Sequence, residues 1–250
     1  LNSAYGFDFL YAPELTPAVV AEVLGKWQGV GKAGGGKAGG WPSWAFENHD
    51  APRAVSRWCA PQDADRFARV KIALLAALRG NIILYQGEEL GLRQDDIPFE
   101  LLQDPEAIAN WPLTLSRDGA RTPMPWLAQE PLGGFTTGKP WLPLSARNIG
   151  RAVEVQQGDR DSLLELTRGL LALRRETPAL RLGRLEAIAA EGPLLSFDRV
   201  SGNQRVRCLF NLSARPAKPR GLPPLATPLA QVNGGSSQSM PGYSALYLRL

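Results

Sequence analysis

Four consecutive polar residues, 47–50 (ENHD), offer the clearest chemistry in the sequence. They follow a short apolar segment, 44–46 (WAF), that is typical of a buried strand. His49 is the only histidine, which excludes a multi-histidine metal site and leaves a Ser-His-Asp triad or a turn held by side-chain hydrogen bonds. No Gly-x-Ser-x-Gly motif supports the triad. Because the carboxyl ends of barrel strands form the active-site face, this position favours a functional role for His49 and Asp50.

The glycine-rich segment 29–40 contains a GxGxxG and a GxxxxGK pattern, both of which can bind phosphates. Such loops need a strand before them and a helix after them, so that backbone N–H groups and a helix N-terminus meet the phosphates. Here an expected helix precedes the segment, Trp41 and Pro42 follow it, and Ala38 occupies the position where a phosphate loop needs Ser or Thr. The segment is therefore predicted to be a flexible linker, with nucleotide binding as the alternative.

The composition is that of an ordinary globular protein: of 250 residues, 44% are hydrophobic and 21% are charged, which argues against disorder, collagen and coiled coil. The net charge is +4 and the basic residues are scattered among acidic ones without forming a basic stripe, so no nucleic-acid partner is expected. No apolar run is long enough to suggest a membrane span. Two distant cysteines, Cys59 and Cys208, predict a reducing cytoplasm and no zinc or disulfide site. We expect no metal and no cofactor.

The first part of the chain alternates strands and helices. Apolar strands are expected at 4–10, 44–46 and 82–85; one helix begins after Thr16, and a second is capped by Asp63 or Asp65 and ends near 80. Short apolar strands separated by helices favour a parallel sheet, in a barrel or a doubly wound fold. Since the chain begins with Leu1, not Met, and enters a strand at once, we expect it to come from within a longer protein.

The second part has a different pattern. Residues 87–160 show no lasting periodicity and form a connection long enough to be functional. A helix is expected at 161–176, and near Pro178 the apolar period changes to two, which predicts antiparallel strands at 185–188, 194–197, 206–210 and 245–248. This change predicts two domains, 1–179 and 180–250.

Four ordered segments resemble glycoside hydrolase family 13, in its branch of oligo-1,6-glucosidases and α-glucosidases. Residues 44–57 (WAFENHDAPRAVSR) resemble the motif that closes the active site of that family. Residues 83–91 (ILYQGEELG) resemble the eighth barrel strand and its loop, 116–126 (SRDGARTPMPW) the substrate-pocket loop, and 170–180 (LLALRRETPAL) the last barrel helix. These matches extend over most of the chain.

The resemblance implies an α/β fold: the C-terminal part of a (β/α)₈ TIM barrel, beginning near strand six, followed by a small antiparallel β-sandwich-like domain. It also implies that Asp50 is the catalytic carboxylate that stabilises the transition state. His49 would donate a hydrogen bond to the sugar at the cleavage site, and Arg121 would hold the terminal glucose. Phe46, Asn48 and Arg57 match the motif and are expected to have supporting roles only.

The implied activity is that of a retaining α-glucosidase acting on α-glucosides such as maltose, isomaltose or sucrose, by hydrolysis or transfer. A retaining mechanism also needs a nucleophile and an acid/base residue, which the family carries on strands four and five. We expect both in the upstream N-terminal half of the barrel, and the chain by itself to be inactive. The alternatives are a sucrose- or trehalose-acting transglucosidase of the same family and a non-catalytic glycan-binding or interaction domain.

Three other carboxylates are candidates for catalysis by residue type. Asp8 lies in an expected apolar strand, which favours a structural role. Glu88 and Glu89 are adjacent in the loop after the strand at 82–85, where hydrogen bonds to the local backbone are expected. A paired-carboxylate site at these two glutamates remains the alternative.

Overall fold

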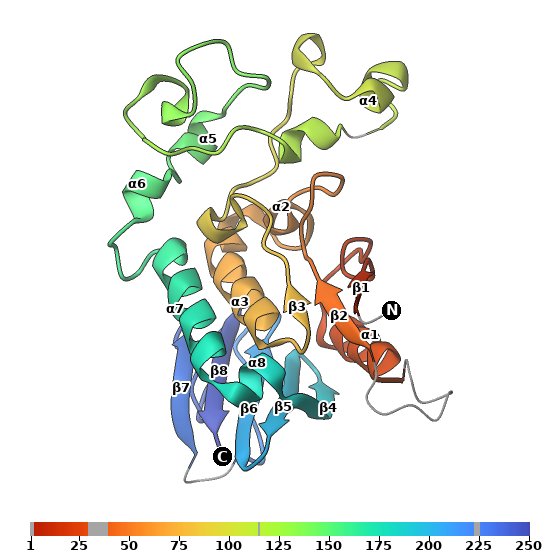
Figure 1. The fold of residues 1–250 in the computed structure, drawn as a ribbon, viewed down its shortest axis with the longest axis vertical. Coiled ribbons are helices and arrows are strands. Elements are labelled where there is room, and N and C mark those ends of the chain that lie inside the picture. The colour runs from red at the N-terminus through yellow and green to blue at the C-terminus, as the bar shows by residue number, and fades with distance from the viewer. Residues whose placement is uncertain (1–2, 30–39, 115, 223–225) are drawn as a thin grey trace. The chain divides into compact units, whose positions relative to one another are not determined.

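The computed structural model describes residues 3–29, 40–114, 116–222 and 226–250 (Figure 1). Contacts divide the chain into a first unit, formed by Leu1–Ala45, Asp65–Ile83 and Thr167–Leu250, and a second unit, formed by Phe46–Ala64 and Leu84–Leu166. The predicted boundary between 179 and 180 rests on the change in apolar period, and it remains a prediction. Most of the glycine-rich segment 29–40 lies outside the described residues.

The first unit begins with a parallel β/α arrangement. It consists of β1 (Ser3–Gly6), α1 (Pro17–Gly29), β2 (Trp41–Trp44), α3 (Ala64–Ala77) and β3 (Asn81–Ile82). The sheet order is β1-β2-β3 with both pairs parallel, and Ser43 of β2 lies opposite Asn81 of β3. The predicted parallel sheet, with its strands separated by helices in the chain, is therefore confirmed.

The strand limits differ from those expected. β1 ends at Gly6 and not at residue 10, because the chain turns there and the N–H of Leu10 donates to the carbonyl of Phe7 (3.0 Å). β2 begins three residues earlier than the apolar segment 44–46 and ends at Trp44. β3 has only two residues, although the N–H of Ile83 still donates to the carbonyl of Trp44 (2.8 Å).

The C-terminal part of the first unit is an antiparallel sheet, as expected. Its strands are β4 (Arg184–Glu191), β5 (Leu194–Ser201), β6 (Gln204–Asn211), β7 (Thr227–Val232) and β8 (Ser244–Arg249), in the order β4-β5-β6-β8-β7. The sequence pattern did not predict β7, which is an edge strand that contains Pro228 and is largely solvent-accessible. Edge strands with a solvent-exposed face lack a clear apolar alternation, and proline is tolerated there.

Two buried arginines bind the C-terminal end of α3. Arg174 lies on α7 (Leu163–Glu176) and Arg199 on β5; the short helix α8 (Pro178–Leu182) lies between these elements in the chain. Their guanidinium groups donate to carbonyls at 2.5–2.9 Å, namely those of Ala76, Leu78 and Gly80 for Arg174, and those of Ala77 and Gly183 for Arg199. A helix C-terminus exposes unpaired carbonyls and a partial negative charge, so the two cations satisfy it. Burial lowers the pKa of both groups, that of Arg199 to about 9.

The second unit consists of short helices joined by loops. They are α2 (Ala54–Arg57), η2 (Pro61–Asp63), η3 (Glu88–Leu90), η4 (Phe99–Leu101), α4 (Pro105–Ala109), η5 (Arg117–Ala120), η6 (Pro131–Gly134), α5 (Ala146–Ile149) and α6 (Val153–Gln156). Small apolar clusters hold them, one formed by Ile97, Leu102, Ala107 and Leu142. The long connection at 87–160 is thus built from single helical turns. Across the described ranges, every helix is too short or too polar to cross a membrane.

Candidate active site

The segment after β2 makes a tight turn that presents Asp50. The side-chain oxygen of Asn48 accepts hydrogen bonds from the backbone N–H groups of Asp50 (2.9 Å) and Ala51 (2.8 Å). This is the turn that the sequence offered as an alternative to a functional site. Because Asn48 makes the turn, the carboxylate of Asp50 is not used in it and is 50% exposed. The turn and an available carboxylate therefore occur together.

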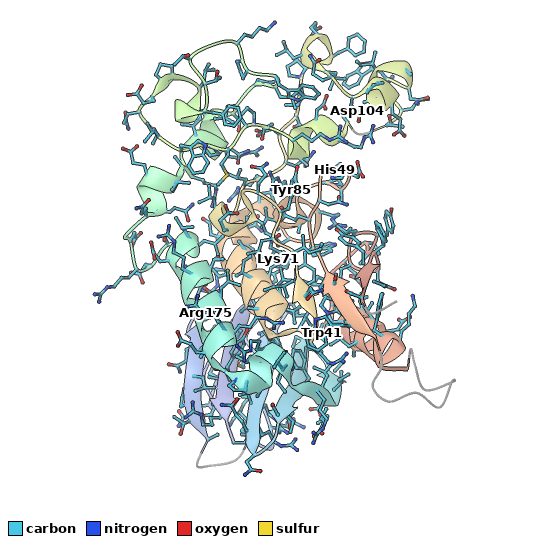
Figure 2. The ribbon with its side chains drawn as sticks, viewed as in Figure 1. Trp41, His49, Lys71, Tyr85, Asp104 and Arg175 are labelled. Carbon is cyan, nitrogen blue, oxygen red and sulfur yellow. The ribbon has the colours of Figure 1, made fainter. Side chains whose placement is uncertain are left out.

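Three cationic or donor side chains surround the Asp50 carboxylate. Arg121 Nη2 lies 3.0 Å from Asp50 Oδ1, and Arg117 Nη1 lies 3.4 Å from the same oxygen. His49 Nε2 lies 3.2 Å from Asp50 Oδ2, and Arg121 Nε donates to the backbone carbonyl of His49 (2.7 Å). The structure thus brings together Asp50, His49 and Arg121, the three residues expected at the site. All three belong to the second unit, and Figure 2 labels His49.

Arg117 is held from its other side by Asp104, also labelled in Figure 2. The Asp104 carboxylate is 1% exposed and accepts from Arg117 Nε (2.9 Å) and Arg117 Nη2 (2.5 Å). These hydrogen bonds with Arg117 keep the pKa of Asp104 well below its usual range, and the same pair raises the pKa of Arg117. Asp104 is therefore charged at neutral pH and fixes the orientation of the guanidinium.

A buried ion pair joins the residues on either side of the turn. Arg53 Nη1 lies 3.2 Å from Glu47 Oε2, and both side chains are 1% exposed. The Arg53 guanidinium also donates to the carbonyls of Gln86 (2.6 Å) and Ala120 (3.0 Å), while Glu47 Oε1 accepts from the N–H of Ala54 (3.1 Å). Arg53 thereby ties the turn at 47–53 to the loop after β3 and to η5, whose C-cap residue is Arg121.

The remaining motif residues have structural roles, as expected. Arg57 Nη2 donates to the carbonyl of Phe46 (2.9 Å), and the Phe46 side chain is buried. Burial lowers the pKa of Arg57. Arg57 therefore binds the backbone at the start of the turn, where Phe46 is buried.

The other carboxylates singled out by the sequence make contacts of their own. Asp8 lies just after β1 and binds Lys26 Nζ (2.6 Å) and Trp27 Nε1 (2.8 Å), so its expected structural role is confirmed. Glu88 is fully buried and its Oε2 accepts from the N–H of Tyr85 (3.1 Å), which confirms the expected local backbone bond. Burial raises the pKa of Glu89.

Three contributors to the site were not predicted from the sequence. Arg53 and Arg117 lie inside motifs that were recognised, but nothing local indicated which carboxylate each would bind. Asp104 lies outside every recognised motif. Its only sequence signal is the Asp-Pro pair at 104–105, which is typical of a helix N-cap, and Asp104 does cap α4 by accepting from the N–H of Glu106 (3.2 Å).

A half-exposed carboxylate beside two arginines and a histidine is suited to binding polyhydroxylated ligands. The carboxylate can accept from hydroxyl groups, His49 can donate to them, and an arginine can clamp a sugar edge with parallel hydrogen bonds. Such a carboxylate also stabilises positive charge that develops on a bound ligand. These side chains follow β2 and the loop after β3, in a chain of parallel β/α units followed by an antiparallel sheet.

This fold and this sequence define an alpha-amylase-type protein, and the chain belongs to the alpha-amylase family: residues 26–183 match the alpha-amylase catalytic domain. The resemblance to glycoside hydrolase family 13 is thus confirmed. A "Probable alpha-glucosidase" of Rhizobium meliloti (strain 1021) is 45% identical over 214 residues, which are 85% of this chain and 38% of that protein. A "Glucan 1,6-alpha-glucosidase" of Streptococcus pneumoniae is 30% identical over 81% of this chain and 40% of that protein.

Solved structures agree with these matches. The crystal structure of the alpha-glucosyl transfer enzyme XgtA superposes with a TM-score of 0.84 at 40% sequence identity, covering 98% of this chain and 45% of that one. The trehalulose synthase MutB from Pseudomonas mesoacidophila MX-45 superposes with a TM-score of 0.84 at 25% identity, covering 51% of its chain. The expected fold, a C-terminal part of a barrel followed by an antiparallel domain, is confirmed. The chain spans less than half the length of the two curated relatives and of XgtA, and about half that of MutB.

Proposed function

We propose that this chain forms part of the active site of a retaining α-glucosidase that acts on α-glucosides such as maltose, isomaltose or sucrose. The observation that supports this proposal is the Asp50 carboxylate, half exposed and contacted by His49, Arg121 and Arg117. The names of the relatives at 45% and 30% identity support the same activity.

In this proposal Asp50 stabilises the transition state. Retaining glycoside hydrolysis passes through an oxocarbenium-like transition state, and hydrogen bonds to the sugar hydroxyls strengthen there by several kcal/mol. Asp50 accepts from ring hydroxyls, His49 donates to the same sugar, and Arg121 clamps its far edge. The nucleophile and the acid/base residue are supplied by the N-terminal half of the barrel, which we propose as the partner of this chain.

The test uses a complete barrel, made by joining this chain to its natural upstream sequence or to the corresponding part of the Rhizobium meliloti relative. Asp50→Asn should lower kcat roughly 100-fold or more and change KM little, because the lost charge acts mainly in the transition state. Steady-state hydrolysis of an aryl α-glucoside measures both constants. Asp96→Asn, a change of the same kind at an exposed position, is the control. An unchanged kcat in Asp50→Asn would contradict the catalytic role and would mean that residues 48–50 form only a structural turn.

Transfer of glucose to a second acceptor is the other candidate function. It is favoured by the similarity to XgtA, an alpha-glucosyl transfer enzyme, at 40% identity. Product analysis of the complete barrel with maltose or sucrose distinguishes the two: trisaccharides or isomerised disaccharides indicate transfer, and glucose alone indicates hydrolysis. Specific sugar binding with neither product would favour the non-catalytic glycan-binding alternative. We also propose a cytoplasmic location, supported by the two free cysteines.

A further inference from the structure

We propose that a hollow in the second unit binds a small phosphorylated ligand through Arg57, Arg93 and Arg147. The hollow has a volume of about 430 Å³ and is lined only by residues of that unit. Sites for small ligands usually have volumes of about 300–1,000 Å³. Neither Asp50 nor Arg121 is among the described residues that line it, so the inference does not depend on the proposed function.

The charge of the hollow is positive. Three arginines and one aspartate, Asp96, line it, which gives a net formal charge of +2. Arg147 Nη2 also lies 3.2 Å from Asp95 Oδ1, and counting this second aspartate still leaves a net charge of +1. The arginines come from three separate segments of the chain, at 57, 93 and 147, and converge on one space. The ligand that this arrangement favours is an anion.

The charge of Arg57 is partly withdrawn from water. Burial lowers the pKa of Arg57, although the negative charge of Glu47 raises it. Removing this guanidinium from water therefore costs more than the attraction of Glu47 returns. Its other described contacts are uncharged: Nη2 donates to the carbonyl of Phe46 (2.9 Å), and the guanidinium lies 4.2 Å from the centre of the Trp58 ring. An anion in the hollow would offset the cost of burying this charge.

The wall formed by Arg93 and Gln94 is fixed before any ligand binds. Asn148 is fully buried, accepts from the N–H of Arg93 (3.0 Å) and donates to its carbonyl (2.9 Å). The N–H of Gln94 donates to the hydroxyl oxygen of Ser56 (2.9 Å), and its carbonyl accepts from Arg147 Nη2 (2.8 Å). Ser56 lines the hollow, and its own O–H can be directed to a ligand. A wall that is already ordered loses little entropy on binding.

A phosphate group suits these donors better than a monovalent anion. It has several charged oxygens, which can accept from guanidinium groups that approach from different sides, and arginine–phosphate bonds are short and frequently bidentate. Inorganic phosphate and a phosphate monoester share this chemistry. The volume of the hollow leaves room for the organic part of a small ester.

The first experiment is isothermal titration calorimetry of the complete barrel at neutral pH with inorganic phosphate, glycerol 3-phosphate and acetate. The phosphates should bind at one site and at least about 10-fold more tightly than acetate, because their bonds to arginine are stronger. Tighter binding of glycerol 3-phosphate would identify an ester as the ligand, and tighter binding of inorganic phosphate would identify the free ion. Equal binding of acetate, or no binding of either phosphate at about 10 mM, would overturn the proposal.

The second experiment repeats the titration with variants of the lining residues. Arg93→Gln should weaken phosphate binding about 10-fold or more, because a hydrogen bond between charged groups is lost. Arg93→Lys should weaken it less, since lysine keeps the charge but not the planar group. Arg147→Gln should weaken binding about threefold or more, a smaller effect because Arg147 is shared with Asp95. The Arg147 side chain is 50% exposed, so this variant tests the proposal even if Arg93→Gln fails to fold.

Two controls locate the ligand. Arg160 is exposed in the same unit and does not line the hollow, so Arg160→Gln should change the affinity less than about twofold. An equal loss there would mean that phosphate is attracted only by the overall charge, against the proposal. Asp50→Asn should also leave the affinity unchanged. Tighter binding in Asp50→Asn would place the phosphate among the arginines beside Asp50 and would overturn the site proposed here.

Discussion

At the scale of single residues, exposure separates the charges that bind ligands from those that hold the structure. Asp50 is half exposed and shares its carboxylate among three neighbours, whereas the side chains of Arg53 and Glu47 are buried and bond to each other and to the backbone. Removing one partner from such a buried pair leaves an uncompensated charge and costs about 3–5 kcal/mol. Under the proposed function the chemistry is at Asp50, and Arg53 stabilises the turn that presents it.

The two cysteines also differ in their exposure to solvent. Cys208 is fully buried in β6, and burial raises the pKa of its thiol to about 12. Because the thiolate is the nucleophile, Cys208 should stay unmodified by iodoacetamide at pH 8 in the native protein, while the half-buried Cys59 reacts. Intact-mass analysis should show one added group before unfolding in urea and two after it. Native Cys59→Ser protein is the control and should gain none; labelling of Cys208 there would mean that β6 opens readily.

At the scale of elements, the end of α3 depends on arginines that are distant in sequence. Arg174 satisfies three carbonyls, those of Ala76, Leu78 and Gly80. Arg174→Met should lower the free energy of unfolding by about 2–4 kcal/mol, because buried carbonyls lose charged donors. Thermal denaturation measures the change.

The neighbouring position provides the control for this prediction. The side chain of Arg175, labelled in Figure 2, is 74% exposed. Arg175→Met should change stability by less than about 0.5 kcal/mol, as is usual for exposed residues without special contacts. Equal effects at 174 and 175 would mean that the bonds to the end of α3 contribute little to folding.

The helices were the elements best predicted from the sequence. The apolar period of 3.6 and the Thr16-Pro17 start predicted α1 and α3 closely, because helix patterns extend over three or four turns. Strand limits were displaced by several residues, since β2 and β3 contain only four and two residues. The edge strand β7 carries no apolar alternation and could not be found by it.

Only those residues of the candidate site that lie within recognised motifs were predictable from the sequence. Spacing placed Asp50 after a strand, but Arg121 lies 71 residues further along, and its contact with Asp50 followed from the family resemblance and not from the pattern. The partnership of Arg117 with Asp104 needs the fold, because Asp104 has no motif and its only local signal is a helix cap. Long-range pairing of this kind is decided by tertiary packing and has no local signature.

At the scale of the whole molecule, the chain passes repeatedly between the two contact-defined units. It leaves the first unit after Ala45 and again after Ile83, and α3 and α7 each span a point where the division falls. Barrel strands and helices are thus joined by long insertions that pack on themselves. The two divisions of the chain therefore describe different properties. The boundary between 179 and 180 marks a change of apolar period, whereas the two units are defined by contacts.

The last prediction concerns activity of residues 1–250 without a partner. A retaining mechanism needs a nucleophile and an acid/base carboxylate about 5 Å apart. Among the described residues, Asp104 is buried and paired with Arg117, and Glu88 is buried against the backbone of Tyr85. The proposed function therefore takes the second reacting carboxylate from the upstream half of the barrel. We therefore expect the chain alone not to release phenol from an aryl α-glucoside.

Adding the missing groups should restore turnover. Mixing or fusing the chain with the N-terminal half of a barrel should produce hydrolysis that is abolished when the N-terminal half is omitted and strongly reduced by Asp50→Asn. Refolded chain alone, checked by circular dichroism for its helices and strands, is the control for folding. Steady turnover by the chain alone would show that its own carboxylates suffice. Glu88→Gln and Glu89→Gln would then be the first variants to make, because burial already raises the pKa of Glu89 as a general acid requires.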